Sequence, residues 1–109
     1  MGQPPIRMGE PPKPGFYLRR LVRHGPLVGC QITFDSAEGF RVMEDGRWEG
    51  PSQDPWLLPL MHSVAFATPC DEAEVKYRIG LKRYAELYQP DAPAANPRKP
   101  IDIDKMIPF

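Results

Sequence analysis

The sequence predicts an α+β domain, in which one C-terminal helix packs on a small antiparallel sheet of about four strands. Three observations support this fold class. Residues 71–89 have helical periodicity, four short segments with strand-like alternation precede them, and Asp45-Gly46 joins the last two segments as a strong hairpin signal. We expect one domain over residues 16–89, between a flexible proline-rich arm at 1–15 and an extended proline-rich tail at 90–109.

The predicted helix has clear end signals. Asp71 can cap the first turn, and Glu74 stands three residues later, as in a capping box. Pro90 then disfavours helical geometry at the preceding residue. Large apolar side chains follow one side of this helix at 3.6-residue spacing, and we expect that side to lie on the sheet. Its members are Ala73, Tyr77, Leu81, Tyr84 and Tyr88, with Gly80 and Leu87 beside them.

The predicted strands form two hairpins. Residues 16–23 and 27–34 flank the turn His24-Gly25-Pro26, and residues 40–44 and 47–50 flank Asp45-Gly46. In the first strand two sets of side chains alternate: Phe16, Leu18 and Val22 on one side, and Tyr17, Arg19, Leu21 and Arg23 on the other. In the second strand we expect four side chains to point inward: Val28, Cys30, Ile32 and Phe34.

The register of the second hairpin follows from its two-residue turn. It places Glu44 opposite Arg47 and Met43 opposite Trp48. Such a short-stranded sheet can curl into a partly closed, SH3-like barrel. Between the hairpin and the long helix, Asp54 can cap a short helix that begins with Pro55, and residues 64–66 can form a short strand or pack on the sheet.

Composition narrows the range of functions. The chain has 14 basic and 14 acidic side chains, so its net charge of zero argues against a dedicated duplex-binding protein. Two cysteines are few for a small secreted domain, and neither a signal peptide nor an apolar stretch of membrane-spanning length is apparent. We therefore expect a cytoplasmic protein with reduced thiols and no membrane partner.

The sequence carries no recognisable catalytic motif. The four candidate metal ligands, His24, Cys30, His62 and Cys70, lack the close pairing that zinc sites show. Cys70 precedes the long helix, whose dipole would lower the pKa of its thiol, yet no partner for a nucleophile is apparent. We expect a non-enzymatic protein with no catalytic residues, no metal site and no cofactor.

A nucleic-acid surface is one alternative. Four side chains, Tyr17, Arg19, Arg23 and Trp48, could combine stacking with phosphate contacts on one face of the sheet and bind single-stranded nucleic acid. The competing interpretation is that the helix covers Tyr17 and Leu21, and that the arginines are ordinary surface charges.

The C-terminal tip predicts a protein partner. Ile107-Pro108-Phe109, preceded by Asp102 and Asp104, resembles the tip of bacterial single-stranded DNA-binding proteins, although Lys105 and Met106 interrupt the acidic run. The resemblance implies that Phe109 anchors in an apolar pocket with a basic rim, that Ile107 and Pro108 shape the approach, and that the two aspartates steer it. Alternatively, Ile101, Ile103 and Met106 pack back on the sheet.

The chain as a whole resembles a group of small uncharacterised proteins of bacteriophages and prophages. The pieces that carry the resemblance are residues 14–17, 20–22, 25–26, 69–74 and 94–102. It implies a phage accessory protein in the cytosol of the bacterial host. The leading hypothesis is binding of a host replication, repair or defence enzyme, which includes inhibition of a defence system. A structural or assembly role in the virion is the second alternative, and the oligomeric state stays open.

Overall fold

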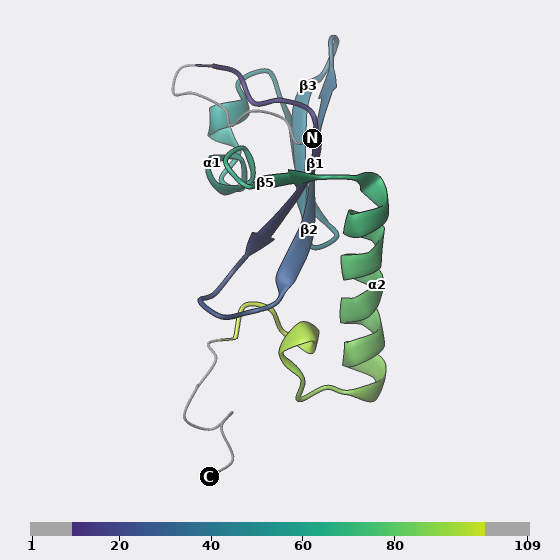
Figure 1. Ribbon diagram of the computed structural model, residues 1–109. Coiled ribbons are helices and arrows are strands. Elements are labelled where there is room, and N and C mark those ends of the chain that lie inside the picture. The colour runs from purple at the N-terminus through teal and green to yellow at the C-terminus, as the bar shows by residue number, and fades with distance from the viewer. Residues whose placement is uncertain (1–9, 100–109) are drawn as a thin grey trace.

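Figure 1 shows the computed structural model, which describes residues 10–99. They form a five-stranded antiparallel sheet in the order β4-β3-β2-β1-β5. The strands are β1 (Gly15–Arg20), β2 (Leu27–Asp35), β3 (Gly39–Glu44), β4 (Arg47–Ser52) and β5 (Thr68–Cys70). Within the described residues β4 and β5 are the two edges, so the sheet is open rather than SH3-like. The α+β prediction is confirmed, with five strands in place of about four.

Helices cover both faces of this sheet. Figure 1 places α2 (Glu72–Tyr88) on one side and α1 (Met61–Val64) on the other. The short 3₁₀ segment η1 (Pro55–Leu57) leads into α1, and a second one, η2 (Pro93–Ala95), follows α2. Helix α1 contacts β1, β2 and β3, whereas α2 contacts β1 and β2. The sheet is therefore the middle layer of the domain.

Local turn chemistry accounts for the β3–β4 hairpin. Asp45 and Gly46 both have positive φ angles, 55° and 85°, which is the backbone of a type I′ turn. The predicted register is confirmed, since Glu44 pairs with Arg47 and Met43 with Trp48. The β1–β2 hairpin is confirmed as well, with β1 antiparallel to β2.

The main core lies between the sheet and α1. Val28, Cys30 and Ile32 of β2 are buried as predicted, and Met61 and Val64 of α1 are fully buried against them. Other buried members of this cluster are Tyr17, Val42, Leu58 and Ala65.

Phe34 lies on the same face of β2 as Ile32, but it is not buried as the inward prediction implied. Its side chain is 51% exposed near the end of β2, outside the buried cluster, and its ring packs on Phe40 with centroids 4.7 Å apart.

The segment between β4 and β5 forms the two short helices η1 and α1. Asp54 caps η1 through its side chain, which accepts a hydrogen bond from the Trp56 backbone N–H at 3.0 Å, as predicted. The strand considered at 64–66 is absent, because Met61, Val64 and Ala65 point into the core at helical spacing. The fifth strand instead begins at Thr68 and pairs with β1.

Residues 90–99 run back along the domain. The segment η2 contacts α2, and Pro97 is buried. A Cβ atom on Gly25, in the β1–β2 connection, would lie 3.6 Å from the Pro97 carbonyl oxygen. This contact places the end of the described chain beside the β1–β2 turn.

Candidate functional site

Helix α2 begins and ends where its sequence directs. The Asp71 carboxylate accepts a hydrogen bond from the Glu74 backbone N–H at 2.9 Å, so the predicted N-cap is confirmed. Two ion pairs at i,i+4 spacing, Glu72 with Lys76 at 2.8 Å and Glu74 with Arg78 at 2.9 Å, support the first turns. The last helical residue is Tyr88.

The side of α2 that faces the sheet is formed by small and branched residues. Val75 and Ala85 are buried, and Lys82 reaches Asp45 in the β3–β4 turn at 2.6 Å. The helix lies close to β2 at Gly29, where an added Cβ would meet the Val75 carbonyl oxygen at 2.9 Å. Such a close approach of helix and strand leaves no room for a tyrosine ring between them.

The predicted orientation of α2 is wrong, because its large apolar side chains point outward. The exposed fractions are 58% for Tyr77, 36% for Leu81, 53% for Tyr84, 69% for Leu87 and 69% for Tyr88. We call these five residues the tyrosine face. The close contact at Gly29 requires the Val75 side of α2 to face the sheet. The opposite side, which carries the tyrosines, therefore points outward.

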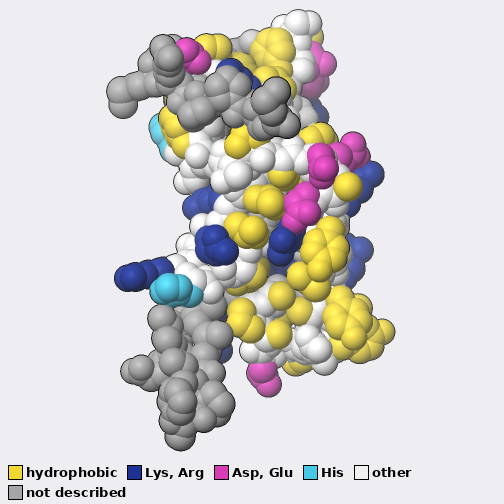
Figure 2. Space-filling view, in the orientation of Figure 1, with side chains coloured by type: hydrophobic (Ala, Val, Ile, Leu, Met, Phe, Trp, Pro, Cys, Tyr) yellow, Lys and Arg dark blue, Asp and Glu magenta, His cyan; other side chains and the backbone are white. Residues whose placement is uncertain are grey.

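The tyrosine face is large for a surface patch. Figure 2 shows apolar side chains gathered along the lower part of α2. From the exposed fractions we estimate roughly 500 Å² of side-chain surface, since large aromatic residues carry about 150–250 Å² each. The rings of Tyr84 and Tyr88 already contact each other, with centroids 4.9 Å apart. Patches of this size on a monomer are often functional.

Charges around the tyrosine face are largely paired among themselves. Lys76 pairs with Glu72, and Arg78 pairs with Glu74 while lying over the Tyr77 ring, 5.4 Å from its centroid. No ion pair forms to Arg83 within residues 10–99. Because most charged side chains around the tyrosine face are already paired, a partner would contact this surface mainly through apolar groups.

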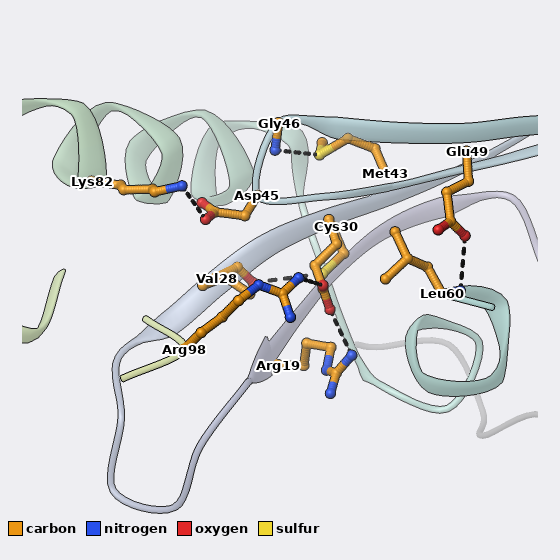
Figure 3. Close-up of polar contacts among 11 residues, drawn as sticks. Arg19, Val28, Cys30, Met43, Asp45, Gly46, Glu49, Leu60, Lys82 and Arg98 are labelled. Carbon is orange, nitrogen blue, oxygen red and sulfur yellow. Dashed lines mark hydrogen bonds and ion pairs between the residues drawn. The ribbon is translucent and has the colours of Figure 1, made fainter. Parts of the chain in front are cut away.

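A second polar feature is the buried carboxylate of Glu44, which is 1% exposed. Arg19 donates to one oxygen at 2.6 Å, and Arg98 donates to the other at 2.7 Å. Figure 3 shows these arginines approaching from β1 and from the C-terminal segment. Both carboxylate oxygens are satisfied, so this cluster ties residues 90–99 to the sheet rather than offering an open site.

The residues of the nucleic-acid alternative do not share one surface. Tyr17 is buried in the core beneath α1, not α2, and its hydroxyl donates to the Lys13 carbonyl oxygen at 2.5 Å. Arg19 is bound to Glu44. Trp48 is 52% exposed but pairs with Met43, on the opposite face of the sheet from Tyr17. Arg23 lies apart from them, in the β1–β2 connection.

The β1–β2 connection and the nearby C-terminal segment border two depressions. One is wide and shallow and is lined by residues 20–24, including two arginines and His24. The other, of about 200 Å³, lies under residues 95–98 and mixes three basic side chains with the carboxylates of Asp45 and Glu86. Lys82 bridges these two carboxylates, which neutralises much of the charge.

The predicted partner-binding residues at the C-terminal tip lie outside the described residues. These are Asp102, Asp104, Ile107, Pro108 and Phe109. Their role stays a prediction. Within residues 10–99, no cluster of three or more His, Cys, Asp or Glu side chains is arranged to hold a metal ion.

The pKa values of both thiols are raised. Burial, with a smaller contribution from Glu44, raises the pKa of Cys30 from 9.0 to about 12. Burial also raises the pKa of Cys70, and Asp71 and Glu74 add to this shift, so the lowering expected from the helix dipole is wrong. Because the folded pKa of Cys30 is raised, its protonated thiol favours folding below pH 9, and this contribution is lost between pH 9 and 12.

We expect the thiols to differ sharply in reactivity. At pH 8, N-ethylmaleimide should modify the partly exposed Cys70 slowly and should reach the fully buried Cys30 only after unfolding. Intact-mass measurement should then show one adduct on the folded chain and two in denaturant. Rapid double modification without denaturant would contradict the burial of Cys30.

Comparison with protein-family models, with curated proteins and with solved structures finds no match to this chain. In the described part of the chain, neither helix has both the length and the apolar character needed to cross a membrane.

The apolar periodicity of α2 predicts the residues of the tyrosine face as one line but assigns them to the core. The sequence did contain a signal for the true orientation of α2. A second line of apolar residues, Val75, Ile79 and Ala85, lies on the other side of the helix. Gly29 in the middle of a strand was the complementary signal, since such a glycine often marks a close backbone approach. The cluster at Glu44 had no comparable signal, because Arg98 lies 54 residues away in sequence.

Proposed function

We propose that this protein acts without catalysis, by binding another protein through the tyrosine face of α2. The supporting observation is that a capped and well-packed helix keeps three tyrosines and two leucines exposed while burying its smaller residues. Tyrosine is suited to such a surface, because its ring supplies apolar contact area and its hydroxyl remains hydrated in the free state.

The geometry of the face defines the chemistry of the partner. From Tyr77 to Tyr88 the face extends about 16 Å, at about 1.5 Å per residue. A helix that presents apolar or aromatic side chains at i, i+3 or i+4, and i+7 has the matching length and spacing. Because most rim charges are already paired, a strongly charged partner would gain little.

The leading hypothesis from the sequence, binding of a host protein, is compatible with this proposal. A phage accessory protein that acts on a host enzyme in the bacterial cytosol would use the tyrosine face as its folded contact. The C-terminal tip, Ile107-Pro108-Phe109, would be a second contact that remains a prediction.

A selection from a displayed library of helical peptides tests the proposal. With the full chain as bait, the enriched peptides should carry apolar anchors at helical spacing. Their affinity should fall at least tenfold for Tyr84→Glu, which places a charge at the centre of the face. Phe66→Glu is the matched control, because Phe66 is 56% exposed and Tyr84 is 53% exposed, but Phe66 lies beside α1. The proposal is wrong if no such peptides are enriched, or if both variants bind them as the unmodified chain does.

A further inference from the structure

The tyrosine face contains a notch. Gly80 is exposed, and a Cβ atom added there would meet nothing within 4 Å. On the helix surface Gly80 lies between Tyr77, three residues before it, and Tyr84, four residues after it. The tyrosine face therefore combines the projecting ring of Tyr84 with an open space above Gly80, about one helical turn away.

We propose that the tyrosine face binds a second copy of this chain, with the two α2 helices antiparallel about a twofold axis that crosses this face midway between Gly80 and Tyr84. This inference rests on the proposed function and names its partner. In such a pair, positions at equal distances before and after the axis face each other. Tyr84 of each copy then lies over Gly80 of the other, and Tyr77 lies against Leu87.

Self-complementarity favours this occupant. The Tyr84 ring of each copy fills the space above Gly80 of the other copy. The twofold axis repeats this contact, so the pair Gly80 and Tyr84 provides two equivalent contacts in the dimer. Glycine also lets the two helices approach closely at the centre of the contact. An unrelated partner would need its own complement to Gly80, whereas a second copy already carries it in Tyr84.

The area is sufficient for a weak dimer. Two tyrosine faces of roughly 500 Å² each give about 1,000 Å² in total, which is the lower limit for a specific interface. Interfaces at this lower limit belong to weak complexes, so we expect monomers at low micromolar concentration and dimers only as the concentration rises.

The rim charges predict how salt acts on this dimer. Lys76 and Arg83 lie on the same flank of α2, and antiparallel helices bring equivalent flanks together. The rim thus provides no attraction between copies. Raising the NaCl concentration should leave dimerisation unchanged or strengthen it, whereas it would weaken the binding of an acidic partner or a nucleic acid.

Sedimentation equilibrium of the full chain tests the inference. Between about 1 and 500 μM, at low and high salt, the unmodified chain and Phe66→Glu should dimerise alike, and Tyr84→Glu should dimerise at least tenfold more weakly. Gly80→Leu is the sharper variant. It adds apolar surface, so non-specific association would increase, but it fills the space for Tyr84 and should weaken the proposed dimer at least tenfold. Circular dichroism checks that each variant is folded.

Disulfide formation tests the orientation in a Cys70→Ser background. Leu81→Cys places a thiol close to the twofold axis, so mild oxidation should link it to its own equivalent. Leu87→Cys should not link to itself, because in the antiparallel pair the two equivalents lie about 15 Å apart, beyond the reach of a disulfide. Linkage of both variants would indicate parallel helices and overturn the proposed arrangement.

The two proposals can fail separately. A chain that stays monomeric at 500 μM, or that dimerises unaltered in Tyr84→Glu and Gly80→Leu, overturns the second copy as the partner. If such a monomer still binds the selected helical peptides, the proposed function stands with a different partner. If it binds none of them, both proposals are wrong.

Discussion

Replacing both Arg19 and Arg98 with methionine is expected to lower the free energy of unfolding by about 3–5 kcal/mol, the usual range when a buried charge loses its partners. Glu44 is 1% exposed, and these two guanidinium groups bind its two oxygens. Without them the carboxylate stays buried in an apolar core with nothing to balance its charge. Urea denaturation followed by circular dichroism measures the loss.

The single variant Arg98→Met should cost much less, about 1 kcal/mol, because Glu44 keeps Arg19 and the Arg98 side chain is 56% exposed. Replacing Glu44 with methionine as well should recover most of the stability lost in the double variant, since an apolar substitute for a buried ion cluster is often neutral. A triple variant as unstable as the double variant would show that packing, and not the unpaired charge, dominates at this position.

Gly29→Ala is expected to destabilise the domain by about 2 kcal/mol, within the range of overpacking in a tight core. The added methyl group would lie 2.8 Å from Val75 Cγ1, 2.9 Å from its carbonyl oxygen and 3.0 Å from its Cα. Two of these atoms belong to the helix backbone, so α2 itself must move. Thermal and urea unfolding of the variant measure this cost.

Gly80→Ala is the matched control, because the same substitution meets open space there. Removing a glycine from a helix interior should raise stability by about 0.5–1 kcal/mol. Both variants are to be compared at low micromolar concentration, where the proposed dimer is dissociated. Equal effects of the two substitutions would contradict the close packing of α2 on β2.

The features that sequence analysis predicted correctly are local. The β3–β4 hairpin depends on two adjacent residues, Asp45 and Gly46, whose preference for positive φ fixes both the turn and the register. The start of α2 likewise depends on Asp71 and Glu74 within one turn. Neither requires knowledge of what packs against the element.

The rotation of α2 could not be predicted in the same way. Both sides of the helix carry apolar residues, and a hydrophobic pattern favours the side with the larger ones. The decision depends on a contact with Gly29, 46 residues before Val75 in the sequence, where only small or branched side chains fit. In α2 the larger apolar side chains are therefore exposed and the smaller ones are buried, the reverse of what their size predicts.

The candidate site shows the same division. The helical periodicity marks every residue of the tyrosine face but predicts that this face is buried, and the sequence predicts the interaction at the C-terminal tip instead. Tyr17 is buried, as one of the two sequence-based alternatives predicted, but by α1 and not by the long helix. Tyr17 is buried because α1 packs on its face of the sheet. This helix forms from residues 61–64 and was not predicted.

Nitration of tyrosines tests most directly whether α2 presents its tyrosine face outward. The chain has four tyrosines, Tyr17 in the core and Tyr77, Tyr84 and Tyr88 on α2. At about 1 μM, tetranitromethane followed by peptide mass spectrometry should modify the three helix tyrosines and spare Tyr17. At 500 μM, Tyr84 should become protected by the proposed dimer. Modification of Tyr17 with protection of the helix tyrosines at low concentration would contradict the orientation of α2 and the function inferred from it.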